Sequence, residues 1–66
     1  MGKLQNGRRV IISNDHELFA GLEGIIAGFD LLNENLVYIV RFLEIPNIKE
    51  YRYNCALIPG TMIIPE

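Results

Sequence analysis

The stretch that decides the fold is Val37-Tyr38-Ile39-Val40-Arg41-Phe42-Leu43-Glu44. β-branched and aromatic residues dominate it, and such residues are enriched in strands because their side chains pack well on a pleated surface. Tyr38, Val40 and Phe42 alternate with residues of the opposite face, which is the two-residue period of a strand. This stretch therefore predicts the central strand of a sheet.

Four further segments predict shorter strands, spaced at intervals of about ten residues along the chain. They are residues 8–13, 24–30, 49–54 and 61–64. The polar run Asn33-Glu34-Asn35 predicts the chain reversal before the central strand, because Asn tolerates positive φ. Residues 55–58, which precede Pro59-Gly60, predict one helical turn. The expected fold is all-β, with five antiparallel strands and one short helical turn before the last strand.

Three glycines punctuate the second predicted strand. Gly21, Gly24 and Gly28 indicate a tight entry, a close backbone approach or a β-bulge. A helix over residues 17–27 is the competing interpretation, since four apolar residues there lie at helical spacing. Interior glycines would each cost such a helix about 1 kcal/mol relative to alanine, so the strand is favoured. The glycine spacing does not match a dinucleotide-binding fingerprint.

Length and composition suggest one small domain, spanning residues 1–66, with residues 1–6 as a frayed leader. Half of the residues are hydrophobic, which is more apolar surface than one small core is expected to hide. Cys55 is the only cysteine, so neither an intramolecular disulfide nor a structural zinc site is expected, and a reducing cytoplasm fits best. No apolar run approaches the roughly 20 residues that span a bilayer, so we expect no membrane contact.

Four short patterns carry a family resemblance: Gly7-x-x-Val10-x-Ile12, Gly21-x-x-Gly24-x-Ile26, Tyr38-x-Val40-Arg41-Phe42 and Ala56-Leu57-Ile58. Together they resemble the small SH3-like barrels related to photosystem I subunit IV, and also the KOW-type domains of ribosomal and transcription proteins. The resemblance covers residues 7–64 and rests on glycines and apolar positions. It implies a five-stranded SH3-like antiparallel barrel. Such barrels are typically non-enzymatic adaptors in larger complexes or RNA-binding modules, so the resemblance implies binding and not catalysis.

The residues offer no catalytic, cofactor or metal site. His16 lies between Asp15 and Glu17, but neighbouring loop residues point in different directions, and one histidine is a poor metal set. Cys55 lacks a neighbouring base in the sequence and is expected to behave as a small hydrophobe. We therefore expect no enzyme, no cofactor and no metal.

The leading hypothesis is a protein-interaction module that self-associates or docks on a larger complex. The closing segment is unusually apolar, and aromatics interleave with charges in residues 49–54. The candidate partner-binding residues are Met62, Ile64, Tyr51, Tyr53 and Phe19, with Leu31 as a further contact.

The alternative is a KOW-like RNA- or DNA-binding module. Half of the six basic residues lie near the start of the chain, and aromatic residues can stack on bases. The formal net charge of −2 disfavours this alternative. Its candidate residues are Lys3, Arg8, Arg9 and Arg52, with Tyr51 as a stacking platform.

Overall fold

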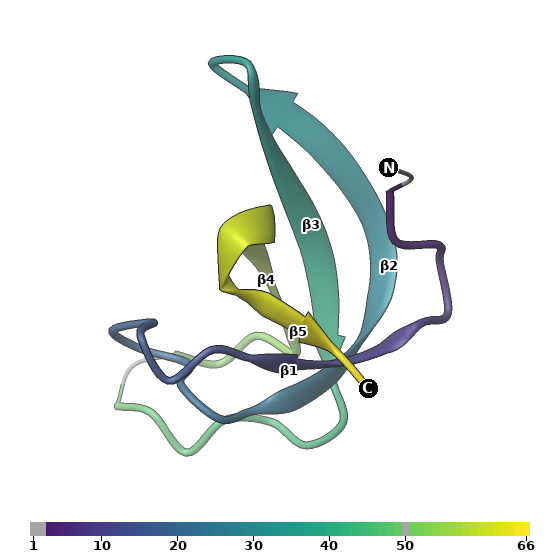
Figure 1. The fold of residues 1–66 in the computed structure, drawn as a ribbon. Coiled ribbons are helices and arrows are strands. Elements are labelled where there is room, and N and C mark those ends of the chain that lie inside the picture. Colours follow the sequence, from purple (N-terminus) through teal and green to yellow (C-terminus); the bar gives the residue numbers. More distant parts are fainter. Residues whose placement is uncertain (1–2, 50) are drawn as a thin grey trace.

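The computed structural model describes residues 3–49 and 51–66, which form one open antiparallel sheet of five strands. Its strand order is β4-β3-β2-β1-β5, so β4 and β5 are the two edges (Figure 1). The prediction of an all-β chain with one helical turn before the last strand is confirmed. The elements are β1 (Arg9–Ile12), β2 (Glu23–Leu32), β3 (Asn35–Phe42), β4 (Cys55–Pro59), the 3₁₀ turn η1 (Gly60–Met62) and β5 (Ile63–Pro65).

The strand predicted as central, β3, is an inner strand that pairs with β2 on one side and with β4 on the other, whereas the middle position of the five belongs to β2. Tyr38, Val40 and Phe42 are all buried, as their alternation predicted. The core comprises Val10, Ile12, Phe19, Ile26, Tyr38, Val40, Phe42, Ile58 and Ile63. Burying an aliphatic or aromatic side chain of this size contributes about 1.5–3 kcal/mol, so this single cluster is the main source of stability.

A tight turn joins β2 to β3. Asn33 and Glu34 have φ values of 50° and 68°, and they separate the paired residues Leu32 and Asn35. Two successive residues with positive φ make a two-residue hairpin loop whose twist matches the strands. The predicted reversal is confirmed, and the tip of this hairpin projects beyond the rest of the sheet (Figure 1).

The glycines of β2 behave as strand residues, so the competing helix over residues 17–27 is wrong. A Cβ added to Gly24 would lie 2.4 Å from Val40 Cγ1 and 2.8 Å from the Arg41 carbonyl oxygen. The register between β2 and β3 shifts between Ile26 and Gly28. Both the close backbone approach and the bulge are therefore confirmed.

Two elements differ from the predictions. Residues 49 and 51–54 form no strand, and Glu50 lies outside the described residues. The predicted helical turn over residues 55–58 is instead β4, because pairing along β3 offers a ladder that one isolated helical turn cannot match. The helical turn comes later, at Gly60–Met62, so the last strand begins at Ile63 and not at Thr61.

The leader is anchored where it is described. The backbone N–H of Leu4 donates to the Tyr38 hydroxyl at 2.9 Å, and Leu4 packs against the core. Gly7 N–H donates to the Ile26 carbonyl at 2.7 Å. Residues 3–6 are thus docked on the sheet, in contrast to the frayed leader that we expected; residues 1–2 lie outside the described part.

Candidate protein-binding groove

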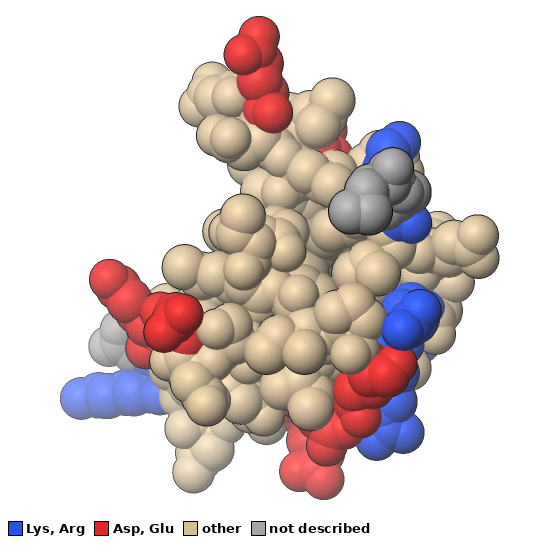
Figure 2. Space-filling model, in the orientation of Figure 1, with Lys and Arg blue, Asp and Glu red and all other residues tan. Residues whose placement is uncertain are grey.

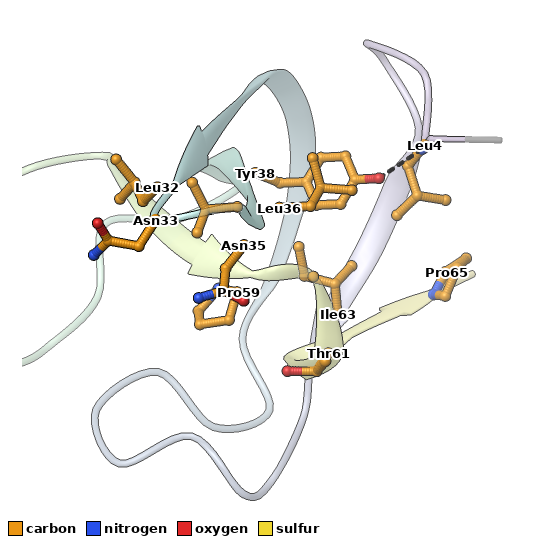
Figure 3. Close-up of a pocket in the computed structure, with 12 residues that line it drawn as sticks. Leu4, Leu32, Asn33, Asn35, Leu36, Tyr38, Pro59, Thr61, Ile63 and Pro65 are labelled. Carbon is orange, nitrogen blue, oxygen red and sulfur yellow. Dashed lines mark hydrogen bonds between the residues drawn. The ribbon is translucent and has the colours of Figure 1, made fainter. Parts of the chain in front are cut away.

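A groove of about 700 Å³ lies between the projecting hairpin tip and the last turn of the chain. Its walls come from β2 and β3 on one side and from η1, β5 and the N-terminal segment on the other (Figure 3). The lining residues are Leu4, Leu32, Asn33, Asn35, Leu36, Val37, Tyr38, Pro59, Gly60, Thr61, Ile63 and Pro65.

Among the described residues, the lining contains no Lys, Arg, Asp or Glu. In the space-filling view, the corresponding central area is tan and charged side chains stand around it (Figure 2). Cores of protein interfaces are depleted in charged residues in the same way. The groove is therefore suited to an uncharged, apolar occupant.

The side of the groove next to the hairpin is formed by residues of β2 and β3. Leu36 and Tyr38 lie two positions apart on β3 and share the core-facing side, but only Tyr38 lies within the core. Leu36 lies nearer the hairpin tip and is half-buried, so part of its side chain faces the groove. Leu32, at the end of β2, is 46% exposed.

The opposite wall packs against β3 at Gly60. A Cβ there would lie 3.4 Å from both the Leu36 carbonyl oxygen and the Tyr38 ring. These are ordinary van der Waals distances, so η1 lies in direct contact with β3 at this position. Thr61 and Ile63 then line the groove beside the Tyr38 ring (Figure 3).

A few polar groups accompany the apolar lining. Asn33 lies in the hairpin turn, Asn35 begins β3 directly after it, and Thr61 lies on η1. Their side chains form no hydrogen bond with another residue in the part of the chain that the structure describes. Amide and hydroxyl groups can donate and accept, so they can bond the backbone of a bound segment.

Phe19 does not lie on a surface available to a partner. It is 5% exposed and its ring contacts those of His16, Phe42 and Tyr51 at centroid distances of 5.0–5.2 Å. The loop after β1 folds back over the sheet, which places Phe19 in the core. This corrects its assignment as a partner-binding residue.

Tyr51 and Tyr53 lie together, with ring centroids 5.5 Å apart. The Tyr51 hydroxyl donates to the carbonyl of Cys55, which fixes the preceding segment to the start of β4. Burial, followed by the charges of Cys55 and Tyr53, raises the pKa of Tyr51 above its ordinary value of 10.0. Tyr53 is 69% exposed, so it remains available for contact, whereas Tyr51 is half-buried against the core.

Met62 and Ile64 do not line the groove; Thr61, Ile63 and Pro65 do. Met62 packs half-buried against the core, and Ile64 is 53% exposed on β5. Leu32 and Leu36 near the hairpin tip also line the groove, although they were not among the residues predicted from the sequence. The sequence pattern that could have identified them is an apolar residue on each side of the polar turn. The two strands extend further than a small core can cover, so apolar residues near their tip remain exposed.

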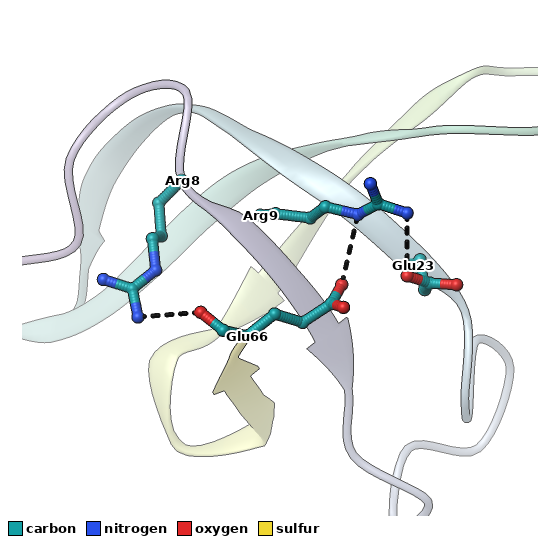
Figure 4. A network of polar contacts seen from close by, with 4 residues as sticks. All are labelled: Arg8, Arg9, Glu23 and Glu66. Carbon is teal, nitrogen blue, oxygen red and sulfur yellow. Dashed lines mark hydrogen bonds and ion pairs between the residues drawn. The ribbon is translucent and has the colours of Figure 1, made fainter.

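The basic residues near the start of the chain are interleaved with acidic groups (Figure 4). Arg9 pairs with Glu23 at 3.1 Å and with Glu66 at 3.4 Å, and Arg8 donates to the backbone carbonyl of Glu66 at 3.0 Å. Desolvation, then the neighbouring Glu23 carboxyl, raises the pKa of Glu66 above 4.5, and Arg9 opposes this shift.

The other two candidate nucleic-acid contacts lie outside this network. The Lys3 ammonium lies 4.0 Å from the centre of the Phe29 ring, and Arg52 is exposed in the segment before β4. A phosphate approaching Arg9 would have to displace two carboxylates. The arrangement therefore gives little support to a phosphate-binding surface.

His16 has a local structural role. Its Nδ1 accepts hydrogen bonds from the backbone N–H groups of Leu18 and Phe19, at 3.1 and 3.2 Å. Cys55 is exposed and free, unlike the small buried hydrophobe that we expected. Among the described residues, no group of three or more His, Cys, Asp or Glu side chains is placed to hold a metal ion. Within the same residues, no helix has the length and apolarity needed to cross a membrane.

Comparison with family models, curated proteins and solved structures finds no match to this chain. Its function must accordingly be argued from its own surfaces.

Proposed function

We propose that this chain is a non-enzymatic protein-interaction module that docks on a larger complex through the groove between the hairpin tip and η1. The proposal rests on one observation: the described residues that line the groove are apolar or neutral polar, and none of them carries a charged side chain. We assign it one occupant, an uncharged, apolar, extended segment of a protein partner.

The amount of exposed surface supports an interaction role. The chain exposes 4977 Å². A folded monomer of its mass, 7.5 kDa, is expected to expose about 4,250 Å². The excess, roughly 700 Å², is close to the area of about 800 Å² that one partner contributes to a standard interface.

The neutral polar groups support an extended segment over a small apolar molecule. Asn33 and Asn35 lie at the hairpin end of the groove, and Thr61 lies on the opposite wall. An extended peptide carries a donor and an acceptor on almost every residue, which such groups can satisfy while Leu32 and Leu36 contact its side chains.

The fold assignment belongs to the same proposal. The strand order and the 3₁₀ turn between the last two strands support an SH3-like barrel, although β4 and β5 are not paired. We further propose that the protein acts in the cytoplasm, since its only cysteine has no intramolecular partner.

The test uses the whole chain and peptides of defined sequence. Random peptides displayed on phage are selected on the immobilised protein, and an enriched peptide is titrated into ¹⁵N-labelled protein. We expect uncharged apolar peptides, with the largest amide shifts at Leu4, Leu36, Thr61 and Ile63. Leu32→Glu should weaken binding at least tenfold, because it places a carboxylate beside the apolar occupant.

Leu18→Glu is the matched control, since Leu18 is 60% exposed and does not line the groove. It should leave peptide affinity within a factor of two. Failure to enrich any peptide, or equal effects of the two variants, would overturn the proposal. Amide shifts at Lys3, Arg8 and Arg52 on adding oligo(U) or oligo(dT) at low salt would favour the nucleic-acid alternative instead.

A further inference from the structure

The direction of the backbone groups on β4 follows from its register with β3. Phe42 N–H donates to the carbonyl of Asn54, which begins the ladder just before β4. In an antiparallel ladder, bonded and non-bonded pairs alternate. Cys55, Leu57 and Pro59 therefore turn their backbone groups away from β3, toward the free edge.

Two observations agree with this assignment. The Cys55 carbonyl accepts the Tyr51 hydroxyl, so it cannot point toward β3. Pro59 has no N–H, and proline is tolerated in a strand where the N–H would face outward. As the N-cap of η1, Pro59 also has a carbonyl that accepts the first bond of that turn. Of the outward groups on β4, those without an assigned partner among the described residues are the N–H of Cys55 and both groups of Leu57.

The other edge, β5, is different. Ser13 N–H donates to the Met62 carbonyl, and Glu66 N–H donates to the Arg9 carbonyl, so the alternation turns Ile63 and Pro65 outward. Ile63 N–H already donates to the Gly60 carbonyl, and Pro65 has no N–H. The β5 edge thus offers acceptors but no free donor. The apolar closing segment had suggested that a partner pairs with this edge, but such pairing would form few hydrogen bonds.

We propose that a second copy of this chain pairs with the β4 edge, β4 against β4 in antiparallel orientation, about a two-fold axis at Leu57. Leu57 N–H of each copy then donates to the Leu57 carbonyl of the other. Cys55 N–H faces the second lone pair of the Pro59 carbonyl of the other copy. Every free outward donor on β4 finds an acceptor in this arrangement.

The side chains on β4 favour the same occupant. The strand carries no charged residue, and charges are a common means by which edge strands avoid pairing. Leu57 is 53% exposed on the outer face, and the two copies would bring their Leu57 side chains together. A pairing of β4 with β5 of another copy would satisfy the two free donors on β4 but leave the Leu57 carbonyl without a donor. The β4 pair is therefore preferred.

This inference names one partner of the interaction module proposed above, but it uses a different surface. Groove binding and β4 pairing can fail separately, because Leu57 does not line the groove. The paired segment is short, so we expect a dissociation constant in the micromolar range, typical of small and transient interfaces.

Sedimentation equilibrium of the whole chain from about 1 µM to 1 mM tests the proposal. This concentration range brackets the micromolar dissociation constant that we expect. We expect a monomer–dimer equilibrium that Leu57→Lys weakens at least tenfold through like-charge repulsion. Leu31→Lys is the matched control, because Leu31 is 61% exposed at the hairpin tip, away from β4. Reducing agent should have no effect, since the two Cys55 side chains would lie at opposite ends of the paired strands.

Hydrogen exchange of the unmodified protein gives a second readout that needs no variant. Exchange of the Leu57 and Cys55 amides should slow as the protein concentration rises, while Ile64 N–H, which already lies within the β1–β5 ladder, should not change. A monomer at 1 mM would overturn the proposal. So would a dimer that responds equally to Leu57→Lys and Leu31→Lys, or one that is lost only in the groove variant Leu32→Glu.

Discussion

Gly24→Ala should destabilise the protein although alanine suits the backbone at this position. Gly24 has no positive φ, so the substitution is opposed only by space. The new Cβ would lie 2.4 Å from Val40 Cγ1 and 2.8 Å from the Arg41 carbonyl oxygen. Val40 is fully buried and stiff at χ1, and the carbonyl belongs to the paired backbone of β3. Neither atom can move without disturbing the sheet.

The size of the effect follows from two opposing contributions. Replacing glycine in a compatible conformation stabilises a protein by about 0.4–1 kcal/mol through the unfolded chain. Overpacking a tight core costs about 1–3 kcal/mol, and this site is at the upper end because a backbone atom is involved. We expect a net loss of about 2 kcal/mol. That is a large share of the roughly 3–10 kcal/mol expected for 66 residues.

Urea unfolding followed by circular dichroism measures the loss, and Gly28→Ala is the control on the same strand. A Cβ at Gly28 would lie 3.3 Å from Ile39 Cδ1, the mobile end of a side chain. This variant should stay within about 0.5 kcal/mol of the wild type, because the side chain can rotate away. Equal free energies of unfolding for Gly24→Ala and the wild type would refute the close approach of β2 to β3.

Two further predictions concern the aromatic cluster. Phe19→Ala should cost about 3–5 kcal/mol in chemical unfolding, as expected for a buried ring, whereas Leu18→Ala should change stability by less than about 0.5 kcal/mol; similar losses would contradict the burial of Phe19. The raised pKa of Tyr51 means that its contribution is full below pH 10.0, the ordinary value, and is lost as the pH rises from there to the higher folded value. Tyr51→Phe should therefore lower the free energy of unfolding by about 1 kcal/mol at neutral pH and should reduce the fall in stability at alkaline pH. Urea unfolding at several pH values measures both effects, and Tyr53→Phe should follow the wild type.

Local patterns predicted the parts of the fold that local physics decides. The alternation in β3, the Asn33-Glu34 turn and the glycines of β2 each carry their own signal, and all three were confirmed. The error at residues 49–54 has a different origin. Tyr51 and Tyr53 do alternate, but they contact other rings, and the partner of β3 is the more apolar segment β4 that follows.

The candidate site was less accessible from the sequence because it depends on long-range placement. The groove exists because the hairpin extends past the sheet and because η1 packs against β3 at Gly60. The register of the last strand also decides which of its residues face the groove, because a shift of one residue moves every side chain to the opposite face of the sheet. Ile63, and not Ile64, consequently faces the core and the groove.

The absence of an outward backbone donor on β5 among the described residues sets an upper limit on assembly. A chain that joins others through both sheet edges can grow into an open-ended filament, as fibrils do. Here Pro65 and the engaged N–H of Ile63 leave β5 with acceptors but without a donor to continue the ladder. Addition at β4 would bring two β4 edges together and leave only β5 edges outside. Growth would then stop at two subunits, which gives a strongly apolar small sheet a backbone-level protection against polymerisation.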